Sequence, residues 1–165
     1  MDMLGMILLI LADQFTKHLA VMYLKEKPAV PIIRDVLELS YLENRGAAFG
    51  MLQNQKIFFV FVASIILAVI AYVIFKMPVD KKYNKLHVFL TLVASGAIGN
   101  MIDRLRLDYV VDFISFVLIH FPIFNVADIY VTVATAFLVV LILFFYREED
   151  LRFLSFHQKK YRELK

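Results

Sequence analysis

Three aspartates in this 165-residue sequence fall close to the ends of long apolar segments. Asp103 closes one such segment, Asp128 precedes another, and Asp112 interrupts the apolar run 110–113 between them. Ionisable side chains at membrane depth are costly, so they are functional candidates by default. Two carboxyl groups held close together cannot both ionise cheaply, and such a pair titrates as a unit. This arrangement suits the hydrolysis of an amide, in which one carboxylate takes a proton from water and the other, protonated, hydrogen-bonds the scissile carbonyl.

Asp112 and Asp128 are the pair that we predict to be catalytic. Helix capping could account for Asp128 alone, and interfacial anchoring could account for Asp103 and Arg104. Neither explains a carboxylate inside the apolar run around Asp112. Asp103 is the third candidate, and we expect its neighbour Arg104 to keep it ionised and structural.

Amides and a second charged pair accompany the aspartates. Asn100 stands three residues before Asp103, so the two can share one helix face. Asn125 stands three residues before Asp128, at the expected start of a helix. Asp13 and Lys17 are four apart in the first apolar segment, where they can pair with each other, or take part directly in function.

Other chemistries have less support in the sequence. The chain has no Cys, which removes disulfides, Cys-ligated zinc and thiol nucleophiles. His120 is the one His expected near the carboxylates, too few for a typical zinc site, and Ser95 lacks a G-x-S-x-G context. A metal ion held by Asp and Asn stays an alternative, as do an ion or proton transporter and a structural subunit without chemistry. Our prediction includes no metal and no cofactor.

The composition indicates a membrane protein. Hydrophobic residues make up 61% of the chain, the mean hydropathy is +0.73, and 18 basic residues nearly balance 15 acidic ones. Intrinsic disorder is excluded, and an ordinary soluble globule is disfavoured. Because a span needs about 20 apolar residues, we predict four transmembrane helices, at about 3–24, 57–75, 86–102 and 129–146. We read the first as a retained helix rather than a cleaved signal peptide.

The distribution of charge predicts the orientation. The connection 76–85 holds four Lys, and the tail 147–165 holds six basic residues. Lys and Arg favour the cytoplasmic side, so both chain ends are placed there, and the loops at about 25–56 and 103–128 are placed outside. The stretch 36–42 alternates apolar and polar residues, which predicts a small sheet in the first outer loop. We treat 1–165 as a single domain: a mainly α integral membrane protein with a small extracytoplasmic β-sheet.

Five segments, taken in order, resemble the signature blocks of the lipoprotein signal peptidase family, also called signal peptidase II. They are 13–17 (DQFTK), 44–50 (NRGAAFG), 96–104 (GAIGNMIDR), 110–113 (VVDF) and 124–128 (FNVAD). Five blocks in order are far more specific than any one of them. The resemblance runs from residue 13 through the fourth span.

The resemblance implies a multi-pass aspartyl peptidase of the bacterial inner membrane, with four transmembrane helices and a small β-cradle on the outer face. Its substrates would be prolipoproteins, cut just before a Cys that carries a diacylglyceryl group, and the cyclic peptide globomycin would inhibit it. Membrane lipid would be a partner, nucleic acid would not, and we expect a monomer. Carried over by motif, Asp112 and Asp128 would be the catalytic pair, with Asp13 and Lys17 in support. The residues implied to shape the pocket or hold the pair are Asn44, Gly46, Asn100, Asp103, Arg104, Asn125 and Ala127.

Overall fold

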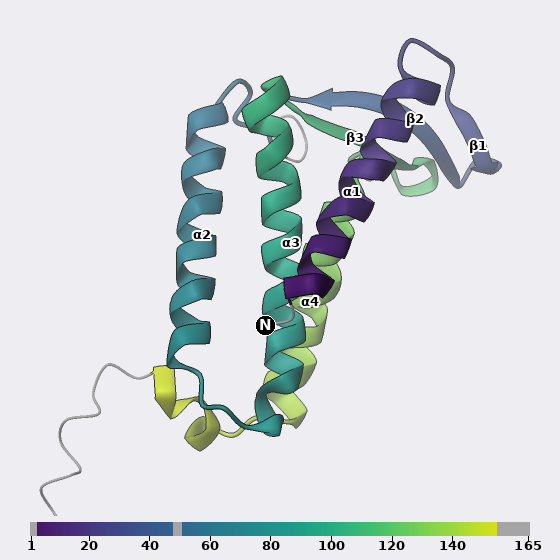
Figure 1. Ribbon diagram of the computed structural model, residues 1–165. Helices are drawn as coiled ribbons and strands as arrows, with labels where there is room; N and C mark the ends of the chain where they lie inside the picture. The colour runs from purple at the N-terminus through teal and green to yellow at the C-terminus, as the bar shows by residue number, and fades with distance from the viewer. Residues whose placement is uncertain (1–2, 48–50, 155–165) are drawn as a thin grey trace, which may run out of the picture.

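The computed structural model describes residues 3–47 and 51–154. Four long helices run alternately up and down: α1 (Met3–Leu24), α2 (Lys56–Lys76), α3 (Asn84–Leu107) and α4 (Val126–Phe144). All four are long and apolar enough to cross a membrane. A small sheet lies at one end of the helices, which we call the sheet side, shown at the top of Figure 1. The prediction of a mainly α membrane protein with four spans and a small sheet is confirmed.

Two of the predicted spans were placed too short at the sheet side. The helix predicted at 86–102 continues past Asp103 and ends at Leu107, where Asp108 adopts a left-handed φ of 69°. The helix predicted at 129–146 begins at Val126, because Asn125 and Asp128 form a capping box. Both errors arise because the prediction treats Asp103 and Asp128 as helix boundaries, whereas each of them lies within its helix.

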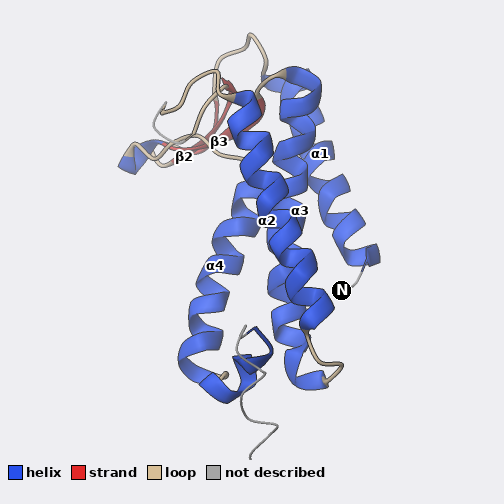
Figure 2. Cartoon of the chain, turned by 90° about the vertical axis from the view of Figure 1, so that its left-hand side faces the viewer, coloured by secondary structure: helices blue, strands red, loops and turns tan. Residues whose placement is uncertain are grey.

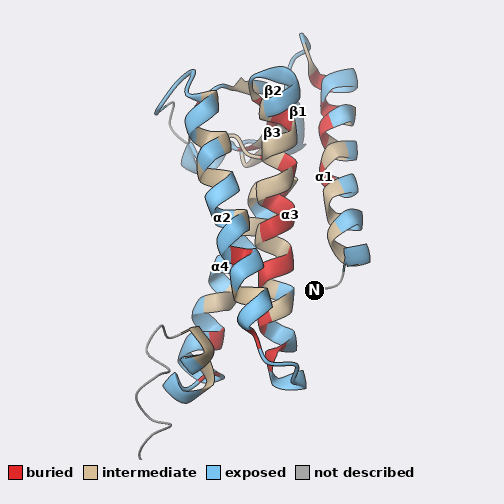
Figure 3. Ribbon diagram, turned by 60° about the vertical axis from the view of Figure 1, so that its left-hand side comes forward, coloured by how far each residue is buried: buried red, intermediate tan, exposed pale blue. Residues whose placement is uncertain are grey.

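Helix α3 is the centre of the bundle, and α1, α2 and α4 pack around it. Its buried face, red in Figure 3, carries the small residues Ala94, Ser95, Gly96 and Gly99. A Cβ atom on Gly96 would lie 2.6 Å from the carbonyl oxygen of Ala127 in α4. Small residues here allow α3 and α4 to approach each other closely.

The antiparallel sheet has the order β1 (Val30–Ile33), β2 (Leu37–Asn44), β3 (Val110–Phe116). The predicted strand at 36–42 corresponds to β2, while β3 was not foreseen as a strand because its first four residues are all buried and do not alternate. A register shift in β2 between Leu39 and Leu42 places Leu42 opposite Asp112. The sheet packs against the last turns of α1, with Ala20 and Leu24 touching Val111 and Phe113.

The opposite end of the bundle is closed by two short 3-10 helices, η2 (Lys81–Tyr83) and η4 (Glu148–Leu154). The Lys82 ammonium pairs with the Asp150 carboxylate, and the Tyr83 hydroxyl donates to the Asp150 carbonyl oxygen. The first part of the predicted tail, 147–165, therefore folds back under the helices. Its remaining residues, 155–165, lie outside the described part of the chain, as do residues 48–50 of the second sequence block.

Candidate active site

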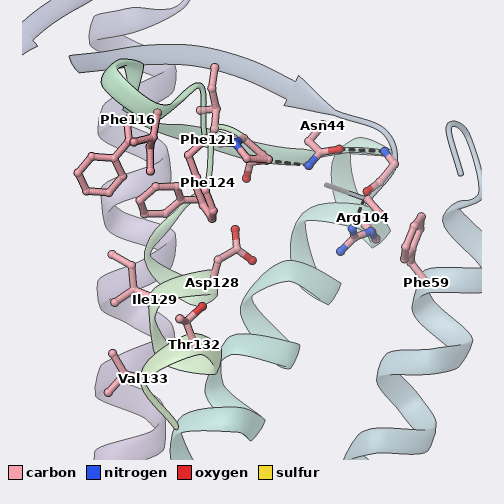
Figure 4. A pocket seen from close by; sticks show the side chains of 16 residues that line it. Asn44, Phe59, Arg104, Phe116, Phe121, Phe124, Asp128, Ile129, Thr132 and Val133 are labelled. Atoms are coloured by element: carbon pink, nitrogen blue, oxygen red, sulfur yellow. Dashed lines mark hydrogen bonds between the residues drawn. The ribbon is translucent and has the colours of Figure 1, made fainter. Parts of the chain in front are cut away.

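Asp112 and Asp128 come from different elements and line one cavity. Asp112 lies in β3 and is 1% exposed, and Asp128 is the third residue of α4. The cavity has a volume of about 630 Å³ and opens between the sheet, α3 and the first turns of α4. Figure 4 shows the Asp128 carboxylate pointing into it, below Asn44 and beside the apolar side chains of α4.

Three asparagines connect the two carboxylates. The Asn125 side-chain NH₂ donates to Asp112 Oδ1 at 2.6 Å and to the Asn100 oxygen at 3.2 Å. The Asn100 NH₂ donates to Asp128 Oδ1 at 2.8 Å, and the Asn44 NH₂ donates to Asp112 Oδ2 at 2.8 Å. Asp128 Oδ2 accepts from the Asn125 backbone N–H at 3.1 Å. Each of the four carboxylate oxygens thus accepts one N–H.

A buried ion cluster lies behind this network. The Lys17 ammonium is 3.0 Å from Asp13 Oδ2 and 3.0 Å from Asp103 Oδ2, and it donates to Asn100 Oδ1 at 2.9 Å. All three charged side chains are almost fully buried. The i,i+4 pairing of Asp13 with Lys17, one of the two interpretations left open by the sequence, is present. Lys17, rather than the expected Arg104, is the cation in contact with Asp103.

Two backbone groups anchor the cluster and the cavity edge. The Ala127 N–H donates to Asp13 Oδ1 at 2.9 Å, which ties the start of α4 to α1. At the edge, Gly46 N–H donates to the Asn44 oxygen at 3.0 Å and Gly46 oxygen accepts from Arg104 at 3.3 Å. A Cβ on Gly46 would clash with the Met51 carbonyl oxygen, so this turn has no room for a side chain.

Arg104 lines the same cavity and is half-buried. Its guanidinium carbon lies 4.5 Å from the centre of the Phe59 ring in α2, and its other contacts are the carbonyl oxygens of Gly46 and Asn100. A guanidinium has five N–H donors, so Arg104 has donors to spare for a ligand. Phe59 contributes the α2 side of the cavity lining, and Arg104 contributes a charged group beside it.

The electrostatic environment of Asp112 favours a proton on that side chain. Its pKa is raised to about 6, first by burial and then by the negative charge of Asp128, while the N–H donors of Asn44 and Asn125 act in the opposite direction. Asp112 therefore holds a proton more readily than an isolated aspartate does, as a carboxyl pair that works with one proton requires.

The structure brings all the predicted site residues into one continuous set of contacts. Sequence reasoning missed Gln14 and Phe59. The Gln14 NH₂ donates to Asp103 Oδ1 at 2.9 Å and to the Gly99 carbonyl oxygen at 3.2 Å. The signal for Gln14 was its place between Asp13 and Lys17, three residues before the lysine on the same face of α1. Nothing in the apolar span around Phe59 singled it out.

Ser95 and His120, considered above for other chemistries, take no part in the hydrogen bonds around the carboxyl pair. The Ser95 hydroxyl is fully buried and donates to the Thr91 carbonyl oxygen in its own helix. His120 is exposed, in the turn after β3. Among residues 3–47 and 51–154, no three His, Asp or Glu side chains are grouped so that they could hold a metal ion.

Fold and site together define a class: an integral membrane protein of four helices that holds a carboxyl pair in a cavity at one end of the bundle. Comparison with known proteins makes the class specific. Residues 5–144 match the family model described as signal peptidase (SPase) II. The chain belongs to this family of proteases.

Curated relatives and solved structures agree. The lipoprotein signal peptidase of Caldanaerobacter subterraneus subsp. tengcongensis is 47% identical over 80% of this chain and 88% of its own length. The lipoprotein signal peptidase of Clostridioides difficile is 42% identical over 84% and 92%. A solved structure described as a bacterial membrane enzyme superposes with a TM-score of 0.75 at 31% identity, covering 85% of each chain.

Proposed function

We propose that Asp112 and Asp128 are the catalytic pair with which this chain cleaves signal peptides from prolipoproteins. Removal of these signal peptides is the function of lipoprotein signal peptidases, to whose family the chain belongs. The observation that carries the residue assignment is the shared cavity, in which both carboxylates are held by amide donors.

The pair can carry out acid–base hydrolysis without a covalent intermediate. A water molecule between the two carboxyl groups would lose a proton to the ionised one as it attacks the scissile carbonyl. The protonated partner would hydrogen-bond the carbonyl oxygen and then supply the proton that the leaving amine needs. The mechanism requires one proton on the pair before attack, and no cofactor enters it.

We assign the resting proton to Asp112. Its pKa of about 6 reflects burial and the charge of Asp128. Asp128 is at the third position of α4, where the partial positive charge of the helix start favours a carboxylate. Asp128 would therefore be the base that activates water, and Asp112 the acid that polarises the carbonyl.

The remaining candidate residues would position the pair or the substrate. Asn44, Asn100 and Asn125 hold the carboxylates, and the cluster of Asp13, Lys17 and Asp103 holds Asn100. Arg104, with donors to spare, would bind a carbonyl of the substrate peptide. Gly46 and Ala127 act through their backbone groups.

The cavity suits a substrate that is part peptide and part lipid. Asn44 and Arg104 line one end, and the apolar side chains of Ile129, Val133, Phe116 and Phe121 line the other (Figure 4). We propose that the peptide bond before a diacylglyceryl-modified Cys lies at the polar end, while the acyl chains stay on the apolar side. Binding of the remote lipid would then orient the amide for attack. Globomycin, as an inhibitor, would occupy the same cavity.

The proposed setting is the bacterial cytoplasmic membrane, with both chain ends in the cytoplasm and the site at the outer face. The lysine-rich connection after α2 and the start of the tail lie together at the end away from the sheet. Lys and Arg in short connections favour the cytoplasmic side. One chain of residues 1–165, acting as a single domain and a monomer, would suffice, because the carboxyl pair is assembled within one bundle.

The test replaces each carboxyl by an amide of the same shape. Asp112→Asn and Asp128→Asn should each reduce cleavage by at least about 10²-fold, the contribution expected of acid–base groups, with unchanged abundance in the membrane. Asp35→Asn is the matched control, since Asp35 is 90% exposed at the turn between β1 and β2. Normal processing by either site variant would refute the assignment.

Substrate class needs a second experiment with the purified protein. A diacylglyceryl-modified prolipoprotein should be cleaved just before the modified Cys, and its unlipidated counterpart far more slowly. Equal cleavage of both substrates would show that the protein is a peptidase but that it does not recognise the lipid.

A further inference from the structure

An apolar loop stands out on the sheet side of the molecule. It comprises residues 116–121, which contain η3 (Val117–Ile119). Leu118 is 64% exposed, Ile119 66% and Phe121 50%. The loop contains no Asp, Glu, Lys or Arg. A contiguous exposed patch of this kind marks a surface that binds a partner or a membrane.

Contacts with the rest of the protein hold both ends of the loop in place. The Phe116 and Phe121 rings both pack against Phe124, with ring centres 5.7 and 5.8 Å away. The Val117 N–H donates to the Val36 carbonyl oxygen at 3.0 Å, which fixes the loop to the β1–β2 connection. With its flanks anchored, Leu118 is left projecting outward at the apex.

The loop continues the lipid-facing surface of α4. Ile119 and Phe121 line the same cavity wall as Ile129 and Val133 from the first turns of α4. Those two α4 residues are themselves 38% and 52% exposed on a membrane-spanning helix. In Figure 2 the short helix beside β2 and β3 projects sideways, near the level at which α4 begins and below the top of α3. The apolar surface therefore passes from α4 onto the loop.

The backbone and one side chain limit how deep such a loop can lie. Irregular backbone is tolerated in lipid only where its polar groups are satisfied. The N–H groups of Val117, His120 and Phe121 all donate to carbonyl oxygens of the protein. His120, exposed in the same loop, needs hydration. These features suit the boundary between headgroups and acyl chains rather than the hydrocarbon centre.

We propose that residues 116–121 insert shallowly into the lipid leaflet on the sheet side. The apolar wall of the cavity then meets the bilayer directly, and an acylated ligand reaches it without crossing water. The occupant of the exposed patch is lipid, because the patch is continuous with a helix surface that already faces lipid. The route for an acylated ligand rests on the proposed function, whereas the position of the loop in the leaflet does not depend on which residues are catalytic.

The test uses the absence of Trp from the whole sequence. A single Trp introduced by Leu118→Trp reports its own surroundings, and Leu118 is not among the residues that line the cavity. Two reference variants bracket it: Val139→Trp, on the exposed face of α4, and Val79→Trp, which is fully exposed in the connection after α2. Each full-length variant is reconstituted in phosphatidylethanolamine and phosphatidylglycerol vesicles that contain acyl chains brominated near the headgroup or near the chain end.

The three variants should differ in a fixed order. Leu118→Trp should emit at shorter wavelength than Val79→Trp and lose most of its emission to lipid brominated near the headgroup. Val139→Trp should be quenched more by lipid brominated near the chain end. Retained prolipoprotein cleavage by Leu118→Trp establishes that the variant is folded.

Two results would overturn the assignment of this loop to lipid. One is long-wavelength emission from Leu118→Trp that is quenched by aqueous iodide and not by brominated lipid. The other is shielding of this Trp only after a second protein is added, which would assign the patch to a protein partner. Deep quenching that matches Val139→Trp would contradict the shallow position.

Discussion

At the scale of single residues, each asparagine of the site is fixed at both ends of its amide. The Asn100 oxygen faces the Lys17 ammonium, so its NH₂ must face Asp128. The Asn44 oxygen accepts the Gly46 N–H, so its NH₂ must face Asp112. The Asn125 oxygen accepts the Asp128 N–H at 3.1 Å, with the same consequence. The N–H donors are thus oriented toward both carboxylates before any substrate binds.

Lys17→Met should destabilise the protein severely. Removing the ammonium leaves the Asp13 and Asp103 carboxylates buried without a cation. Breaking a buried ion pair from one side costs about 3–5 kcal/mol. Thermal unfolding of the purified variant in detergent measures the loss.

The matched control for Lys17→Met removes the charges that the substitution leaves behind. Adding Asp13→Asn and Asp103→Asn to Lys17→Met should recover part of the lost stability, because no uncompensated charge then remains. Cleavage should stay low in the triple variant, since Asn100 has lost the ammonium that orients it. A triple variant no more stable than Lys17→Met would argue against the charge explanation.

Asn44→Ala should shift the pH dependence of cleavage. The Asn44 donor lowers the pKa of Asp112, so its removal raises that pKa, and the pair keeps its proton to higher pH. Activity that requires the protonated pair is lost as pH rises through this pKa. The basic limb of kcat/KM should therefore move to higher pH in Asn44→Ala.

Tyr41→Phe is the control for Asn44→Ala. Tyr41 lies in the same strand, but its hydroxyl contacts Glu43 and Tyr109 rather than Asp112. The basic limb of kcat/KM for Tyr41→Phe should stay at the wild-type position. An unchanged or lowered limb in Asn44→Ala would show that Asp112 does not set this part of the profile.

At the scale of elements, the close approach of α3 to α4 sets the position of the site. Gly96→Val should weaken this contact, because a Cβ there meets the Ala127 carbonyl oxygen at 2.6 Å and the Val131 Cγ2 at 2.7 Å. Overpacking of this kind costs about 1–3 kcal/mol. It also displaces the start of α4, which carries Asp128, so cleavage should fall together with thermal stability. Ala136→Val, on the exposed face of α4, should change neither.

The helices and much of the site could be predicted from the sequence, because apolar length and charge are local properties. The first span matches α1 at both ends, and the i,i+4 spacing predicted the Asp13–Lys17 pair. The strand β3 could not be predicted in this way. Its apolar run is buried on both faces, where periodicity does not separate a strand from other buried segments.

Contacts between segments that lie far apart in the sequence could not be predicted either. Lys17 reaches Asp103 and Asn100 across more than eighty residues. The adjacent Arg104 looked like the natural partner of Asp103 because sequence shows neighbours along the chain only. The five ordered blocks located the residues of the site without indicating which of them touch.

At the scale of the whole molecule, the four spans force the two chain ends to one side of the membrane and the sheet to the other. The connection after α2 and the helix η4 both lie at the end away from the sheet (Figure 1). The fold determines this alternation but does not determine which side of the membrane is the cytoplasm. The basic residues 76, 81, 82 and 85 in the connection are the reason that we propose the cytoplasm for their side.

The absence of Cys from the sequence allows this orientation to be tested one residue at a time. Arg34→Cys, 93% exposed at the turn of the sheet, should react with a membrane-impermeant thiol reagent in intact cells. Val79→Cys, fully exposed at the other end, should react only after the cells are permeabilised. The two sites are about equally accessible in the folded protein, so the membrane alone would produce the difference. Labelling of Val79→Cys but not Arg34→Cys in intact cells would place the carboxyl pair at the cytoplasmic face, where a lipidated Cys held in the outer leaflet could not reach it.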